Sequence, residues 1–212
     1  MKKLRFQQPM YSIYSFSENI LVKCPQCEGL CSVKTKLGKY GLWCGDNNTS
    51  SLYCQECGYT THDKEKWFGY FQGILKMHCG FCGTKIHYTS KPTKNPLLPE
   101  LVECKFCKVE KTYPLVWERY KGKETIDPYF GLELWLQTEV KNNTLWVYNT
   151  DHIKYLQDYL QSTLREDDTR HKYSMVSNLP KWIKLAKNRN LVLKKLKILE
   201  KQSKHLKGND GI

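Results

Sequence analysis

The chain has 212 residues, of which 40% are hydrophobic, 26% charged and 13% aromatic, with 34 Lys and Arg against 21 Asp and Glu. This composition is typical of a globular chain and excludes a disordered or collagen-like one. The basic N-terminus lacks the apolar run of a signal peptide, and no stretch approaches the roughly 20 apolar residues of a membrane span. We therefore expect a cytoplasmic protein that crosses no membrane, in which ten cysteines indicate metal binding rather than disulfides.

Eight of the ten cysteines form four C-x-x-C pairs that repeat along the chain. The pairs are Cys24/Cys27, Cys54/Cys57, Cys79/Cys82 and Cys104/Cys107. Their first members lie 55 residues apart (24 to 79) and 50 residues apart (54 to 104), which predicts two copies of one small unit. We expect an N-terminal segment (1–19), a first zinc ribbon (20–62) and a second zinc ribbon (63–115).

Short β-prone tracts accompany the pairs. Leu30 to Lys36 and Thr84 to Tyr88 follow the first pair of each copy and predict strands of small antiparallel sheets. The aromatic run 67-WFGYFQGILKM-77 predicts a strand that leads into the second unit.

Residues 116–149 are predicted to form an aromatic β-hairpin region. Glu133 to Val140 and Thr144 to Tyr148 flank Lys141-Asn142-Asn143, and Asn accepts the backbone conformations of a tight turn. Asp127, in 127-DPYFG-131, has the residue type of a catalytic acid, but an Asp that caps a turn before Pro is the interpretation we favour.

Residues 150–212 are predicted to form a helical, Lys-rich region. Thr150 is placed to cap a first helix, and Pro180 suits the first position of a short second one. A further helix is predicted from about Leu191. The apolar positions that recur at helical spacing are Ile153, Leu156, Leu160 and Leu164 in the first helix and Val192, Leu196, Leu199 and Leu206 in the last.

The C-x-x-C spacing suits a tetrahedral metal ion. Two thiolates separated by two residues turn back onto one ion, and two such turns complete the four sulfur ligands that zinc binds at about 2.3 Å. We predict two structural Zn²⁺ per chain, because four cysteine ligands leave no open position for water. Gly58 and Gly83 follow the second cysteine of their pairs, where the chain turns sharply, whereas Glu28 and Lys108 take this place in the other two pairs.

Two cysteines lie outside the pairs. Ile86 takes the place of Cys31 in the second copy, so we expect Cys31 to be a buried thiol that faces Cys44. The alternative, in which Cys31 or Cys44 enters the first metal site, stays open. His78 and His87 are interpreted as neighbours of the second site rather than ligands.

The motifs CPQC, YCQECGYT, CGFCGTKI, IDPYFGLELWLQ, TLWVYN and LPKWIKLAKNR resemble those of uncharacterised bacterial proteins with zinc ribbons of the transcription-factor-IIB type. The resemblance runs from about residue 20 to 200 and implies zinc ribbons followed by a characteristic C-terminal region. It implies no activity. With the patterns above, the expected fold is α+β: two tandem four-cysteine zinc ribbons, a β-hairpin and a C-terminal helical region.

The charge favours a nucleic-acid partner. Residues 179–212 carry 10 Lys and Arg against 2 acidic residues, and the formal net charge of +13 falls to about +9 when two zinc-bound four-cysteine sites are counted. The candidate contacts for DNA or RNA phosphates, together with the ribbon surface, are Lys181, Lys184, Lys187, Arg189, Lys194, Lys195 and Lys197.

Two other classes of function compete with nucleic-acid binding. A protein-interaction role, as a regulatory subunit or an immunity or inhibitor protein, is the alternative, since rigid ribbons and aromatic residues make a docking platform. An enzyme is not expected, because the sequence has no G-x-S-x-G, P-loop or H-E-x-x-H motif.

Overall fold

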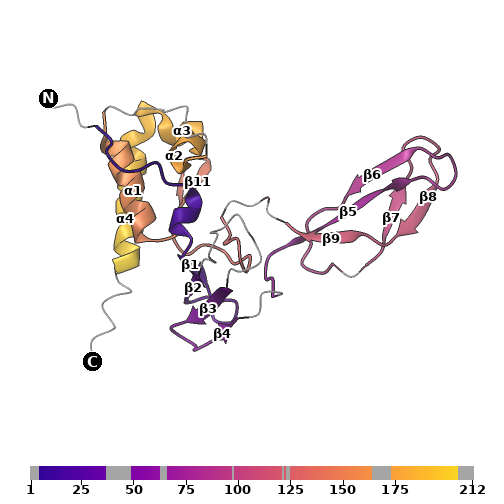
Figure 1. Cartoon of the computed structure of the whole chain (residues 1–212), viewed down its shortest axis with the longest axis horizontal. Coiled ribbons are helices and arrows are strands. Elements are labelled where there is room, and N and C mark those ends of the chain that lie inside the picture. Colours follow the sequence, from indigo (N-terminus) through magenta and orange to yellow (C-terminus); the bar gives the residue numbers. More distant parts are fainter. Residues whose placement is uncertain are drawn as a thin grey trace. The chain divides into compact units, whose positions relative to one another are not determined.

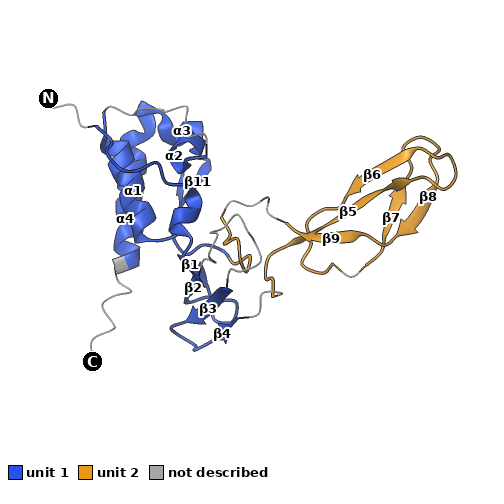
Figure 2. Cartoon of the chain, viewed as in Figure 1, with its two compact units in different colours: residues 1–64, 133–212 blue, residues 65–132 orange. Residues whose placement is uncertain are grey.

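The computed structural model describes residues 5–36, 49–62, 66–96, 98–120, 122, 125–163 and 173–204. The chain forms two compact units, which Figure 2 shows in different colours: unit 1 is residues 1–64 with 133–212, and unit 2 is residues 65–132. The predicted second ribbon lies in unit 2 with residues 116–132 of the predicted hairpin region. The predicted first ribbon shares unit 1 with the N-terminal segment, the rest of the hairpin region and the helices.

Unit 1 combines two small antiparallel sheets with helices (Figure 1). The first sheet has the strand order β1-β2-β3-β4, and β10 pairs with β11 in the second. The elements are η1 (Ile13–Phe16), β1 (Asn19–Lys23), β2 (Leu30–Lys36), β3 (Thr49–Cys54), β4 (Thr60–Thr61), β10 (Gln137–Val140), β11 (Asn143–Trp146), α1 (Thr150–Gln161), α2 (Met175–Asn178), α3 (Lys181–Lys184), η4 (Ala186–Asn188) and α4 (Arg189–Lys204).

Unit 2 consists of strands. A three-stranded antiparallel sheet has the order β6-β5-β9, and a separate hairpin pairs β7 with β8. The elements are β5 (Phe71–His78), β6 (Lys85–Thr89), β7 (Glu100–Glu103), β8 (Glu110–Tyr113) and β9 (Val116–Arg119). The mixed α+β class with small antiparallel sheets and a C-terminal helix is thereby confirmed.

The helices of unit 1 pack through the apolar faces that the sequence predicts. α1 packs against α4 (Figure 1), and the residues of the predicted stripes that the structure describes are all buried: Ile153, Leu156, Leu160, Val192, Leu196 and Leu199. Leu164 and Leu206 lie outside the described residues. The opposite faces carry exposed polar residues, as an amphipathic helix requires, together with the exposed Ile198 of α4.

The outer edge of β1 joins the first sheet to the chain that precedes and follows the β10–β11 hairpin. The N–H of Leu21 donates to the carbonyl of Tyr148, that of Lys23 to Glu133, and that of Trp135 back to Leu21, all within 3.0 Å. Ile20, Val22 and Leu134 are fully buried behind these bonds. The first cysteine sheet and the C-terminal region therefore share one core.

Local details differ from the sequence predictions. Asn149, not Thr150, caps α1: its side-chain oxygen accepts the N–H of His152 at 2.9 Å, and its amide donates to the carbonyls of Phe16 and Asn19. The hairpin loop has two residues, because Asn143 already pairs with Val140. The strand predicted from Trp67 begins at Phe71, because Trp67 folds back to donate its indole N–H to the Tyr70 carbonyl.

Candidate metal centres

Each C-x-x-C pair forms the same tight turn, here called a knuckle. In every knuckle the first cysteine accepts, at its carbonyl, the N–H of the residue four positions on, and donates its own N–H to the carbonyl five positions on. All eight bonds are between 2.7 and 3.2 Å. The residue that follows the second cysteine has a left-handed backbone in each case, with φ of 60° at Glu28, 72° at Gly58, 71° at Gly83 and 62° at Lys108.

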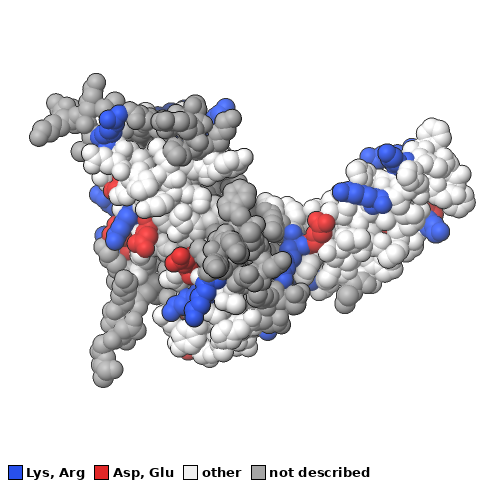
Figure 3. All heavy atoms as spheres, in the orientation of Figure 1, with Lys and Arg blue, Asp and Glu red and all other residues white. Residues whose placement is uncertain are grey.

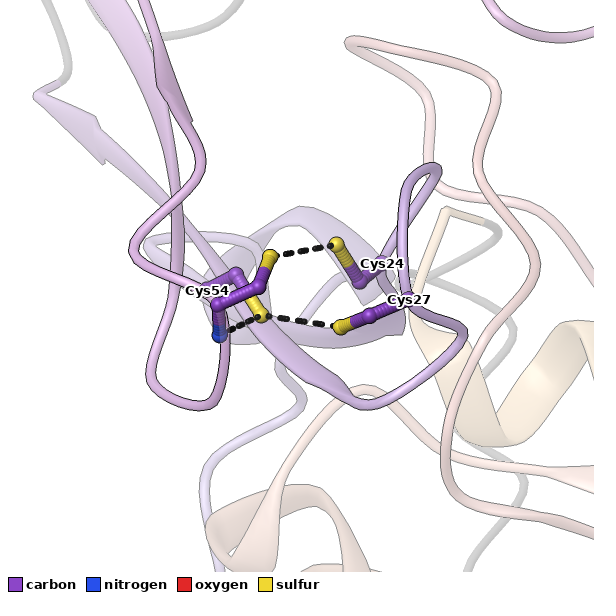
Figure 4. Close-up of side chains that lie close together, drawn as sticks. Cys24, Cys27 and Cys54 are labelled. Carbon is purple, nitrogen blue, oxygen red and sulfur yellow. Dashed lines mark hydrogen bonds between the residues drawn. The ribbon is translucent and has the colours of Figure 1, made fainter.

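The knuckles pair to gather the eight predicted cysteines into two groups of four. Cluster 1 holds Cys24, Cys27, Cys54 and Cys57, and cluster 2 holds Cys79, Cys82, Cys104 and Cys107, with all sulfurs of a cluster within 4.8 Å of one another. The knuckle between β1 and β2 meets the knuckle between β3 and β4 in cluster 1, and Figure 4 shows Cys24, Cys27 and Cys54 turned toward one another. In cluster 2 the β5–β6 knuckle meets the β7–β8 knuckle.

The sulfur spacing fits a tetrahedral metal ion. Cys24 and Cys57 are 3.6 Å apart, as are Cys27 and Cys54, and the two matching pairs of cluster 2 are 3.7 Å apart. Four sulfurs at about 2.3 Å from a central ion lie about 3.8 Å from one another, whereas a disulfide requires about 2.05 Å. Both groups are therefore suited to one structural metal ion each, and four thiolates are the ligand set of structural zinc.

Hydrogen bonds favour the thiolate form of Cys24 in cluster 1 and of Cys82 in cluster 2. Burial opposes ionisation of Cys24, but the N–H groups of Cys27 and Gln26 outweigh it and lower its pKa to about 6. The hydroxyl and N–H of Thr84 lower the pKa of Cys82 to about 6 as well. Although the N–H of Val109 favours the thiolate of Cys107, burial and the adjacent sulfurs raise its pKa to about 12. A divalent cation at the centre removes this repulsion between sulfurs, so metal binding and full deprotonation are coupled.

Cys31 is buried beside cluster 1 without joining the four sulfurs. It lies on β2, in register with Cys54 on β3, and shares its buried face with Val33 and Thr35. Burial and the neighbouring sulfurs of Cys24 and Cys54 raise the pKa of the Cys31 thiol. The prediction of a buried thiol is confirmed. Cys44, its predicted partner, lies outside the described residues.

The other candidate functional residues of the sequence belong to neither metal cluster. Asp127 is buried, and its carboxylate accepts the N–H groups of Tyr129, Phe130 and Leu132 at 2.6 to 2.9 Å. These bonds form the turn that the sequence predicts at Asp127, in place of a catalytic acid. His78 and His87 are exposed and belong to neither group of sulfurs.

The structure divides the seven candidate nucleic-acid contacts into exposed and half-buried residues. Lys181, Lys187, Lys194 and Lys197 are exposed, whereas Lys184, Arg189 and Lys195 are half-buried. Lys184 donates to the carbonyl of Ser177 at 2.7 Å. On the face shown in Figure 3, Lys and Arg side chains are interspersed with acidic and uncharged residues and form no continuous patch among the described residues.

Two features escaped the sequence predictions. Lys201 is exposed on the same face of α4 as Lys194 and Lys197, and the spacing i, i+3, i+7 could have revealed it. Phe81 and Phe106 are 70% and 74% exposed at the knuckles of cluster 2. Both are the third residue of a C-x-x-C pair, and this shared position could have revealed them in the sequence.

Comparison with known proteins gave no match to a family model, a curated protein or a solved structure. The resemblance to zinc ribbons of the transcription-factor-IIB type therefore stays a prediction. Within the described residues, no helix is both long enough and apolar enough to cross a membrane.

Proposed function

We propose that the chain is a non-enzymatic protein with two structural zinc ions that binds the phosphates of nucleic acid through α4. The observation that supports this most is the lysine face of α4. Lys194, Lys197 and Lys201 are exposed and lie opposite the buried Val192, Leu196, Leu199 and Ser203. At about 100° per residue these lysines fall within about 60° of one another around the helix axis.

The basic residues of α4 outnumber its acidic residues. Glu200 is the one acidic residue among those of α4, and its carboxylate accepts the side-chain amide of Gln157 on α1 at 3.2 Å. A lysine row of this kind suits contact with phosphate oxygens. It is less suited to reading base edges, for which bidentate Arg, Asn and Gln are the usual residues.

The aromatic residues next to lysines at the start of unit 2 contribute less to the proposal. Trp67, Phe68 and Tyr70 are half-buried. The guanidinium of Arg119 lies 5.2 Å from the Trp67 ring, and Lys66 and Lys94 lie over Phe68 and Tyr70. Their faces are already used inside unit 2, so α4 is expected to bind phosphate without stacking on bases.

The test compares two double variants that remove the same charge. Lys194→Gln with Lys197→Gln should weaken binding to a DNA or RNA oligomer, and should reduce the slope of log K against log salt by about 1.4 to 1.8, since each lost phosphate contact contributes about 0.7 to 0.9. Lys34→Gln with Lys36→Gln, exposed on β2, serves as the control and should change the slope much less. Zinc content should be unchanged in both.

Equal effects of the two double variants would overturn the assignment to α4. Absence of oligomer binding at low salt, together with co-purification of one protein, would overturn the nucleic-acid proposal and favour the regulatory-subunit or inhibitor alternative.

A further inference from the structure

The two clusters differ at one position of their knuckles. The third residue of each C-x-x-C is Gln26 and Glu56 in cluster 1 but Phe81 and Phe106 in cluster 2. The side chain of Glu56 is used within unit 1, where it accepts the N–H of Leu30 at 3.0 Å. Phe81 and Phe106 instead project into solvent, with 70% and 74% of their surface exposed.

The metal clusters do not explain these two phenylalanines. Cluster 1 makes the same knuckle hydrogen bonds and closely similar sulfur spacing with Gln and Glu at the position. The hydrophobic cluster next to the cysteines includes neither phenylalanine; its buried residues are Leu75, Cys79, Ile86, Val102, Cys104, Tyr113 and Leu115. One exposed aromatic residue is ordinary, but two at equivalent places around one metal cluster indicate a surface that contacts a partner.

A hollow with a basic rim lies beside Phe106. It has a volume of about 260 Å³ and is bounded by β6, the start of the second knuckle and β7. Its charged and aromatic lining residues are Lys85, His87, Tyr88, Glu103, Lys105 and Phe106. At this size it is smaller than the roughly 300 to 1,000 Å³ of sites for drug-sized ligands, and so suits one small chemical group.

Two lysines at the rim of this hollow are available to contact phosphate. Glu103 forms an ion pair with Lys108 at 3.0 Å, and the carboxylate of Glu100 accepts the hydroxyl of Tyr88. Lys85 and Lys105 are exposed and form no ion pair with a described residue. Exposed aromatic rings next to lysines are the arrangement by which proteins hold unpaired nucleotides.

We infer that the cluster 2 end of unit 2 binds single-stranded nucleic acid, with bases stacked on Phe81 and Phe106 and phosphates held by Lys85 and Lys105. A single strand fits better than a duplex, because the faces of its bases are free to stack. This inference rests on the proposed nucleic-acid function and adds a second site, which selects single strands, to the phosphate contacts of α4.

The test uses the zinc-loaded full chain and fluorescently labelled oligo(dT) and oligo(U) of about 12 nucleotides, within the usual site size of single-strand binders. Phe81→Gln and Phe106→Gln place a polar residue at the position where cluster 1 has Gln and Glu. The knuckles should therefore keep their fold and their zinc. Each substitution should weaken oligomer binding by about tenfold. The salt slope should stay at its wild-type value, because stacking releases no counterions. Val116→Gln, which alters another exposed apolar residue of unit 2, is the matched control and should bind like the wild type.

Three further measurements separate the possible results. Phe106→Trp should retain binding, Lys85→Gln with Lys105→Gln should lower the salt slope, and a duplex of equal length should bind more weakly than the single strand.

Wild-type binding by the Phe81→Gln/Phe106→Gln variant would overturn the inference, as would equal affinity for duplex. If the α4 variants alone lose binding, the proposed function stands without this site. If the phenylalanine variants lose a protein partner instead of the oligomer, the surface is a protein-docking site and the inference is wrong.

Discussion

The residue that follows the second cysteine of each knuckle has the left-handed conformation whatever its side chain. Gly58 and Gly83 adopt it without steric cost, whereas Glu28 and Lys108 adopt a similar φ with a Cβ atom present. The left-handed region costs a residue with a side chain roughly 1 to 2 kcal/mol. Two of the four knuckles therefore retain local strain that their metal clusters and hydrogen bonds must offset.

Replacing Glu28 by Gly is expected to increase the free energy of unfolding. Relief of the left-handed strain is partly offset by the extra freedom of Gly in the unfolded chain, so the net gain should be about 0.5 to 1 kcal/mol. Denaturant unfolding of the zinc-loaded protein measures it. Gly83→Ala is the reverse control, since an added Cβ there meets no atom within 4 Å, and it should lose a similar amount through backbone conformation alone. A destabilised Glu28→Gly variant would contradict this account.

At the scale of elements, each cluster depends on two hairpins whose strands end in knuckles. The β1–β2 and β3–β4 hairpins bring cluster 1 together, and the β5–β6 and β7–β8 hairpins bring cluster 2 together. Several of the strands are short, as β4 has two residues and β7 and β8 have four each. Pairings of this length are marginal alone, so a metal ion that joins two hairpins is expected to hold them.

The roles of two neighbouring cysteines can be separated by substitution. Cys27→Ser removes one sulfur of cluster 1 and should leave one zinc per chain by elemental analysis. Cys31→Ser should retain both zincs, although a hydroxyl in place of the buried thiol should cost on the order of 1 to 3 kcal/mol of stability where it finds no hydrogen-bond partner. Loss of a zinc from Cys31→Ser would restore the alternative in which this residue is a ligand.

At the scale of the whole molecule, the two units have cores of different kinds. Unit 1 contains the helical packing of α1 against α4 in addition to cluster 1. The hydrophobic cluster around the cysteines of unit 2 has seven buried residues among those described, two of which are the cluster cysteines Cys79 and Cys104. Such a small core supplies little stability without a metal ion or another cross-link.

Removal of zinc should therefore affect the units unequally. The protein as purified should hold one zinc in each cluster. A chelator should unfold unit 2, because zinc binding to a four-cysteine site contributes on the order of 10 kcal/mol to folding. The circular dichroism of α1 and α4 should persist to a larger extent. Cys104→Ser, measured without chelator, should reproduce the loss in unit 2 alone. If chelation left the β-sheet signal of the circular dichroism spectrum unchanged, a structural role for the metal in unit 2 would be contradicted.

The sequence by itself determined the features that depend on local spacing. Four equal C-x-x-C pairs predicted two groups of four sulfurs, Leu30 to Lys36 predicted β2 at its observed bounds, and the apolar stripes predicted the buried faces of α1 and α4. The C-x-x-C turn, the strand and the apolar stripes each lie within one turn, strand or helix, and the repeat of the pairs after 55 and 50 residues predicted how they group. The backbone geometry that produces such patterns is the same in every protein.

The tertiary structure decided which segments share a core and which side chains stay exposed. The bonds of β1 to residues 133–135 and Tyr148 join positions more than 100 residues apart, and such pairings leave no periodic trace in either segment. The same applies to Asn149, which caps α1 because Phe16 and Asn19 hold its amide. Phe81 and Phe106 have an apolar residue type that sequence patterns associate with a core, and only the folded knuckles place them in solvent.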